Sequence, residues 1–378
     1  MRARGTDEEH RVATPLELFF DLCFVVAVAQ GASSLHHGLT EDRLGDALVG
    51  YPLVFFAIWW AWMNVTWFAS AYDNDDVPYR LAVLVQIAGA LILAAGVPRL
   101  FDDRDLSVVT LGYVVMRVAL VWQWLRAARG DPERRLTALR YAGAVAACTA
   151  GWGLLLAVPE GWRIVGVPVM IVAELSVPIW AERTGVTTWH PHHITERYGL
   201  FTLIVLGESV LAATVAIQTA LDAGEALGGL IEVASGGLLI VFSMWWLYFG
   251  KPARHGGVTS MTSFVWGYGH LVVFASAAAV GAGMSVVVDQ ATHHAEITAR
   301  AATATVAIPV ALYLLSVWVL HSWRSPRGLH ALHGLRFLVA VGLVLLAILT
   351  ESVLPIGLVL AALVASTIVS PAPASAEN

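Results

Sequence analysis

Long apolar stretches separated by short polar loops make up most of the chain. Twelve such runs, of about 20 residues each, match the length of a helix that crosses a bilayer. We expect them at residues 16–36, 47–70, 79–98, 107–127, 138–157, 163–183, 195–220, 228–249, 263–288, 298–321, 334–350 and 353–369. The runs are continuous rather than alternating, which excludes barrel strands. The pattern therefore predicts an all-α fold, a polytopic transmembrane helix bundle of about twelve spans.

The loops divide this bundle into five regions. Residues 1–15 form an N-terminal segment, 16–183 a first six-helix half, 184–194 a central loop, 195–369 a second six-helix half, and 370–378 a tail. The tail is rich in Pro, Ala and Ser, so we expect it to be disordered.

Short motifs recur between the two halves in the same order. Val54–Trp60 resembles Ile240–Trp246, and Val121-Trp122 matches Val317-Trp318. Two further pairs follow the same register: Leu139-Arg140-Tyr141 with Leu335-Arg336-Phe337, and Glu17 with Glu196. Six spans per half is an even number, so both halves enter the membrane from one side. The motifs predict two parallel six-helix pseudo-repeats.

The composition is typical of a membrane protein and excludes several classes of function. Of 378 residues, 58% are hydrophobic and 13% are charged, about half the charged fraction of a soluble domain. The only lysine, Lys251, lies in a loop, which rules out a Schiff base inside the bundle. The chain has no phosphate-binding Gly-x-x-x-x-Gly-Lys motif, and Cys23 and Cys148 both fall inside apolar runs. We expect no cofactor, no nucleic-acid partner and no disulfide framework, and the sequence does not fix the oligomeric state.

Lys and Arg residues near the span ends predict the orientation. With the N-terminus inside, sixteen of them lie on the cytoplasmic side and five on the outer side. By the positive-inside rule, both termini should be cytoplasmic.

Two acids open the first span. Glu17 and Asp21 are four residues apart, so they share one helix face. Because like charges repel there, the pair implies a cation, a shared proton or a basic partner. Glu17 also suits a helix start, with Thr14 as N-cap and Pro15 in the first turn.

Charged residues also lie deep in later spans. Arg117 and Glu174 sit inside apolar runs of the first half, and an ion pair there is expected. Glu174, Asp21 and Glu208 are all possible partners of Arg117, and the sequence does not choose between them.

The central helix carries the densest group of polar residues, His193, Glu196, Arg197 and Glu208. Arg197 and Glu208 are eleven residues apart, on one face but too distant to touch, so we expect each to meet a different neighbour. One interpretation is a structural ion pair between helices. The other is a substrate or proton pathway.

Aromatic and acidic clusters surround the second span. Trp59, Trp60 and Trp62, with Trp245 and Trp246 in the second half, either line a cavity or pack against neighbours. An amide as deep as that of Asn64 is expected to bond across helices. Asp73, Asp75 and Asp76 resemble the start of a calcium loop but lack its glycine and its distant glutamate, so they are weak candidates for a metal site.

Three of these stretches together resemble one family. They are Glu17–Leu22, the Trp59–Asn64 segment with Asp73–Asp76, and His193–Phe201 running on through Gly207–Ser209. In order, they are similar to the bacterial low-temperature-requirement A family. The resemblance implies a multi-pass protein of the bacterial cytoplasmic membrane, named for a cold-growth trait, and it supplies no substrate.

Three classes of function remain open. Buried acids and an arginine at membrane depth, with a parallel repeat, favour a secondary transporter or ion-coupled permease for a small solute or ion. A sensor or assembly factor without flux is the second class. The third is an intramembrane enzyme acting on lipid, in which Asp21, Asp73, Asp75 and Asp76 hold a divalent cation.

Overall fold

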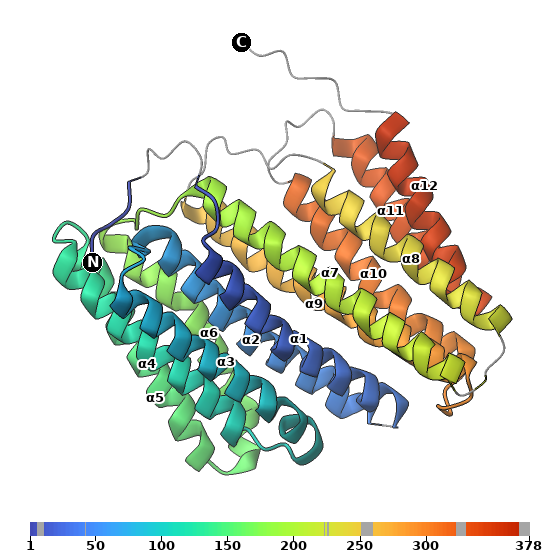
Figure 1. The fold of residues 1–378 in the computed structure, drawn as a ribbon, viewed down its shortest axis with the longest axis horizontal. Helices are drawn as coiled ribbons and strands as arrows, with labels where there is room; N and C mark the ends of the chain where they lie inside the picture. Colours follow the sequence, from blue (N-terminus) through green and yellow to red (C-terminus); the bar gives the residue numbers. More distant parts are fainter. Residues whose placement is uncertain are drawn as a thin grey trace. The chain divides into compact units, whose positions relative to one another are not determined.

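The computed structural model describes residues 1–5, 11–41, 43–222, 224, 227–250, 260–322 and 330–369. Within these ranges the chain forms twelve α-helices and two short 3₁₀ helices, with no strand, so the predicted all-α fold is confirmed there (Figure 1). The helices are α1 Pro15–Thr40, α2 Leu44–Tyr72, α3 Val77–Asp103, α4 Ser107–Gly130, α5 Arg135–Ala157, α6 Glu160–Ala181, α7 Pro191–Asp222, α8 Leu227–Phe249, α9 Ser260–Ala291, α10 Ala299–Ser322, α11 His330–Leu346 and α12 Leu354–Val369. Lys251 and the predicted disordered tail lie outside the described residues.

Ten of these helices, α1 to α10, are long and apolar enough to cross a membrane. Two shorter apolar helices follow, at Gly334–Thr350 and Leu354–Val369. Many large apolar side chains on the long helices are exposed on the protein surface, among them Trp162, Ile164 and Leu154. Contact between these side chains and lipid tails has no hydrophobic cost, whereas their exposure to water would be unfavourable.

The chain divides into two compact units. The first comprises Met1–Ser34 and Val49–Phe201, and the second comprises Leu35–Leu48 and Thr202–Asn378. Helices α1, α2 and α7 therefore contribute residues to both. This division does not compare the two halves of the sequence, so the six-helix repeat stays a prediction.

In the first unit, helices α3 to α6 pack in chain order, each against the next (Figure 1). Small residues set the spacing between α3 and α4. A Cβ atom at Gly112 would lie 2.4 Å from the backbone nitrogen of Leu93, and one at Gly89 would lie 2.8 Å from the Gly112 carbonyl. Backbones that approach this closely are typical of packing between membrane helices.

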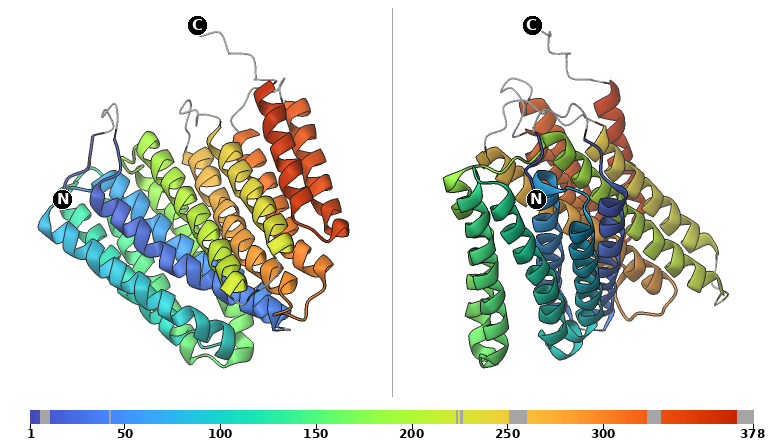
Figure 2. Two further views of the ribbon diagram at one scale, coloured as in Figure 1. Left: turned by 45° about the vertical axis from the view of Figure 1, so that its right-hand side comes forward. Right: turned by 60° about the vertical axis from the view of Figure 1, so that its left-hand side comes forward.

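Glycines also allow close helix packing in the second unit. Helix α10 packs against α9 and α12 against α8 (Figure 2). A Cβ atom at Gly283 would lie 2.4 Å from the carbonyl of Thr305, and one at Gly357 would lie 2.8 Å from that of Gly236. In α7, the Ser209 hydroxyl donates to the Ala277 carbonyl of α9 at 2.9 Å.

Helix α7 begins four residues earlier than the hydropathy pattern indicates. Pro191 is its first residue, and the Ile194 amide donates to the His190 carbonyl at 3.0 Å. Proline fits the first helical position because its missing N–H has no partner there anyway. As a result, His193 lies in the first turn of a helix rather than in a loop, and it faces the start of α1.

Candidate functional site

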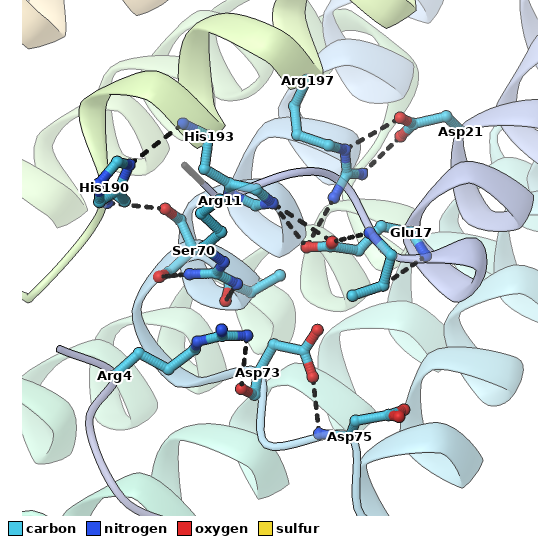
Figure 3. Close-up of polar contacts among 12 residues, drawn as sticks. Arg4, Arg11, Glu17, Asp21, Ser70, Asp73, Asp75, His190, His193 and Arg197 are labelled. Atoms are coloured by element: carbon cyan, nitrogen blue, oxygen red, sulfur yellow. Dashed lines mark hydrogen bonds and ion pairs between the residues drawn. The ribbon is translucent and has the colours of Figure 1, made fainter. Parts of the chain in front are cut away.

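Two fully buried charges, Asp21 of α1 and Arg197 of α7, form the centre of the candidate site (Figure 3). Each lies six residues into its helix, about 9 Å from the helix start. The guanidinium donates to Asp21 twice, from Nε at 3.0 Å and from Nη2 at 2.6 Å. This two-point geometry is the strongest form of an arginine–carboxylate pair. Asp21 is 0% exposed and Arg197 is 1% exposed.

Glu17 joins this pair from one turn earlier in α1. Its Oε1 lies 3.0 Å from Arg197 Nη1, an ion-pair distance. Its Oε2 accepts the Thr14 amide at 2.8 Å, and the Thr14 hydroxyl in turn accepts the Glu17 amide at 3.3 Å. The reciprocal bonds form a capping box, which fixes the carboxylate at the helix start. Glu17 therefore both caps α1 and balances Arg197.

His193 completes what we name the Arg197 cluster: Glu17, Asp21, His193 and Arg197. The imidazole Nε2 lies 3.3 Å from Glu17 Oε2 and 3.2 Å from Oε1. Its Nδ1 has no hydrogen-bond partner among the described residues, although the side chain is fully buried. The cluster contains two carboxylates and one guanidinium, which sum to one negative charge when the imidazole is neutral.

Aromatic side chains enclose the Arg197 cluster. The Trp62 indole donates to Asp21 Oδ1 at 2.6 Å, and its ring packs edge-on against Tyr198. The Trp67 indole donates to the Tyr198 hydroxyl at 3.0 Å. Burial among these rings lowers the local dielectric, so an extra charge in the cluster is costly.

Sequence reasoning missed a second layer of the site. Arg11 is 4% exposed and donates through Nη2 to the Ala69 carbonyl at 2.9 Å and through Nη1 to the Ser70 carbonyl (Figure 3). These are carbonyls of the last turn of α2, where a cation also complements the helix dipole. The Ser70 hydroxyl accepts the His190 amide at 2.9 Å. Nothing in the sequence around Arg11 indicates a helix far along the chain, so no local pattern could have found it.

The three aspartates after α2 do not assemble into one site. Asp75 pairs with Arg80 at 2.7 Å, and Asp76 caps α3 and pairs with Arg126 at 2.7 Å. Hydrogen bonds from these arginines lower the pKa of both acids. Across the described residues, no group of three or more His, Cys, Asp or Glu side chains is placed to hold a metal ion. The structure therefore does not bring together the ligand set that a calcium loop or a lipid-acting enzyme needs.

Asp73 differs from its two neighbours. It is 2% exposed and accepts the Asp75 amide at 2.8 Å. Burial, together with the nearby negative charge of Glu17, raises its pKa to about 6. Arg4 donates to the Asp73 carbonyl at 3.5 Å, so the N-terminal segment lies over this acid (Figure 3).

A second buried group surrounds Arg117 in the middle of α4. We name Arg117, Glu174, Tyr113, Trp60 and Trp152 the Arg117 cluster. Arg117 Nη2 lies 2.9 Å from Glu174 Oε2, and the two side chains are 2% and 0% exposed. Of the three partners that the sequence left open for Arg117, the structure places Glu174 against it.

The remaining candidates are members of neither cluster. Asn64 donates to the Trp60 carbonyl at 2.7 Å within α2, since a side chain can reach the carbonyl four residues back. Among the described residues, the bond across helices that we expect for it is not found. Trp59 is fully buried, whereas Trp245 and Trp246 are 42% and 43% exposed. These two tryptophans of the second half therefore lie partly at the surface of the chain.

Glu196 and Glu208 are half-buried. Glu196 Oε2 accepts no hydrogen bond from the described residues. No described residue pairs with Glu208, so the neighbour that we expect for it stays a prediction. Glu208 follows Gly207, around which there is open space, while the close helix approach occurs at Ser209.

Ten long apolar helices, with charged side chains buried inside them, define a multi-pass helical membrane protein. Residues 12–367 match the family described as bacterial low temperature requirement A protein, and the chain belongs to that family. It is 27% identical over 290 residues to an uncharacterized protein of Rhizobium meliloti (strain 1021), covering 72% of this chain and 68% of that one. No solved structure matches it.

Proposed function

We propose that this protein is a proton-coupled secondary transporter and that the Arg197 cluster is its proton-binding site. The observation that carries the proposal is the charge imbalance of that cluster, in which two buried carboxylates share one guanidinium. Within the four residues of the cluster, one proton cancels the net negative charge, which is expensive in a low-dielectric interior. The Arg11 guanidinium of the second layer also acts on His193. Residues that carry a proton across a membrane are commonly acids and histidines buried in the spans.

His193 is the group in this cluster that accepts the proton. In the neutral imidazole, Nε2–H donates to Glu17, and no described residue uses the lone pair of Nδ1. A proton that binds Nδ1 gives an imidazolium, which then pairs with Glu17 as a full cation. Arg197 no longer has to balance Glu17 and remains with Asp21. Loss of the proton restores the shared arrangement, so protonation changes how tightly α1 is held to α7.

Solute-driven proton movement tests the proposal. Purified protein is reconstituted into liposomes that contain a pH-sensitive dye, and pools of small solutes are added outside. In the wild type we expect at least one pool to change the internal pH, and Glu17→Gln and His193→Gln to abolish the change. His192→Gln is the matched control, since it removes a neighbouring, half-buried histidine of the same helix. Solute flux without pH change would contradict proton coupling. No flux, with a stable partner protein co-purifying, would favour the sensor or assembly class.

The orientation belongs to the same proposal. Both termini are placed in the cytoplasm, in the cytoplasmic membrane, on the strength of the arginine bias and an even number of spans. The Arg197 cluster, at the start of α1, then faces the cytoplasmic side. Reporter fusions after Asp131 and after Gln290 should report cytoplasm and outside respectively. The reverse result, or one side for both, would refute the orientation or the count of twelve.

A further inference from the structure

The carboxylate of Glu174 is saturated with hydrogen-bond donors. Its Oε2 accepts from Arg117 Nη2 at 2.9 Å and from the Trp60 indole at 2.8 Å. Its Oε1 accepts from the Tyr113 hydroxyl at 2.9 Å and from the Trp152 indole at 3.3 Å. An ionised carboxylate has about four acceptor positions. Glu174 therefore has no capacity left for a ligand.

Arg117, in contrast, has hydrogen-bond donors that are not used. Its Nη2 serves Glu174 and the Tyr113 hydroxyl, and its plane lies over the Tyr113 ring with 4.6 Å between the carbon Cζ and the ring centroid. Its Nε and Nη1 are buried and have no acceptor among the described residues. Buried donors left unpaired are rare in proteins, and each one points to a water or an ion that completes it.

We propose that one of these unused donors of Arg117 binds the carboxylate of a small organic acid. The group needed there must supply acceptors, because the cluster offers donors and both oxygens of Glu174 are filled. Nε–H and Nη1–H point away from different edges of the guanidinium, so each takes its own acceptor, and a carboxylate oxygen accepts from such a cationic N–H more strongly than a water molecule does. The binding group lies in the middle of α4, at the depth where transporters commonly hold their solutes.

Charge narrows the class of acid. Glu174 already balances Arg117, so a bound monocarboxylate leaves one net negative charge inside the membrane, and a dicarboxylate leaves two. A monocarboxylate and one proton are neutral as a transported pair, whereas a dicarboxylate and one proton together carry one negative charge. This step rests on the proposed function, in which the Arg197 cluster takes up one proton. The substrate class is therefore a monocarboxylate that travels with one proton.

Thermal unfolding of the purified full-length chain tests binding without any flux. Sodium acetate serves as the probe, with sodium chloride at the same ionic strength as the reference and disodium succinate as the dianion. We expect acetate to raise the melting temperature in a saturable way and succinate to match chloride. If one proton accompanies each acetate, the apparent affinity rises by about tenfold for each unit that the pH falls.

Arg117→Lys is the informative variant. Lysine keeps a positive charge opposite Glu174 but lacks the Nε–H and Nη1–H donors, so the acetate shift should vanish. Arg126→Lys is its matched control, since Arg126 lies on the same helix and pairs with Asp76. An acetate shift that survives in Arg117→Lys would overturn the proposal.

A thiol near the cluster gives a readout that does not depend on this variant folding. Cys148 of α5 is a free cysteine and interacts electrostatically with both Arg117 and Glu174. In Cys23→Ser it is the single cysteine of the chain. Acetate, but not chloride, should slow the reaction of Cys148 with N-ethylmaleimide several-fold.

If acetate causes neither a melting shift nor protection of Cys148, the buried donors of Arg117 hold only water and the proposal is refuted. Acetate binding without solute-driven pH change would support the site and refute the transporter. Proton-coupled flux of another solute, without acetate binding, would support the transporter and refute the carboxylate site at Arg117.

Discussion

The Arg197 and Arg117 clusters each contain a buried arginine and a buried glutamate, but they leave opposite groups unsatisfied. At Arg197, two carboxylates and an imidazole surround one guanidinium, so the group that is lacking is a cation. At Arg117, one carboxylate takes four donors and the guanidinium keeps unused N–H groups, so the group that is lacking is an acceptor. Buried charges of a membrane protein are therefore better understood by counting donors and acceptors than by counting ion pairs.

The largest effect should come from removing the shared cation. Arg197→Leu leaves Glu17 and Asp21 buried against each other without a counter-charge. We expect a loss of unfolding free energy on the order of 3–5 kcal/mol or more, measured by denaturant unfolding in micelles. Adding Glu17→Gln and Asp21→Asn to the same chain should recover much of the loss. If the single and triple variants are equally destabilised, the charge balance is not what holds this cluster.

The corresponding change in the second cluster should cost less. In Arg117→Leu, Glu174 keeps the Trp60, Tyr113 and Trp152 donors, so we expect a loss of about 2–3 kcal/mol. The double variant Arg117→Leu/Glu174→Leu strands no charge and should be within about 1 kcal/mol of the wild type. The comparison would fail if Arg117→Leu proved more damaging than Arg197→Leu.

Asp73 should give stability a pH dependence. Its pKa is about 6 in the folded protein, above the ordinary value of 3.8, so the folded state binds this proton more tightly than the unfolded state does. Stability should therefore rise as the pH falls from about 6 to about 4, by on the order of 2 kcal/mol. Asp73→Asn should flatten the melting temperature across that window. Asp105→Asn, at the other end of α3, is a control that should keep the slope.

The smallest effect on folding should come from Glu208. Because no described residue pairs with this half-buried acid, Glu208→Gln strands nothing and should change stability by less than about 1 kcal/mol. If the acid also carries protons, the same variant loses the pH dependence of transport. A loss as large as that of Arg197→Leu would show that Glu208 has a charged partner after all.

Hydropathy predicted the helices because apolar runs of membrane length have few other solutions. The ends of the helices were harder to predict. Helix α7 starts at Pro191, where the polar residues around it lower the hydropathy, although proline favours the first turn of a helix. The i,i+4 spacing of Glu17 and Asp21 implied a basic partner. It could not tell that the partner is Arg197, 176 residues beyond Asp21, because only tertiary packing makes that choice.

Asn64 shows why side-chain partners are hard to infer. Its depth suggested a bond to another helix, yet the nearest acceptor was the Trp60 carbonyl one turn away. Arg117 shows the opposite limit, since three acids were equally plausible partners until the packing of α4 against α5 and of α5 against α6 was known. Sequence thus identified all the Asp, Glu, His and Arg members of both clusters, while their pairing came from the fold.

Two tryptophans of one helix reach both clusters. Trp62 donates to Asp21 and Trp60 donates to Glu174, and both belong to α2. Two residues along a helix correspond to about 200° around its axis, so the indoles point to nearly opposite sides. Turning α2 about its axis therefore withdraws one indole from each carboxylate at the same time. Rotation of helix α2 therefore couples the two clusters, because a change at one carboxylate that turns the helix also changes the hydrogen bond at the other.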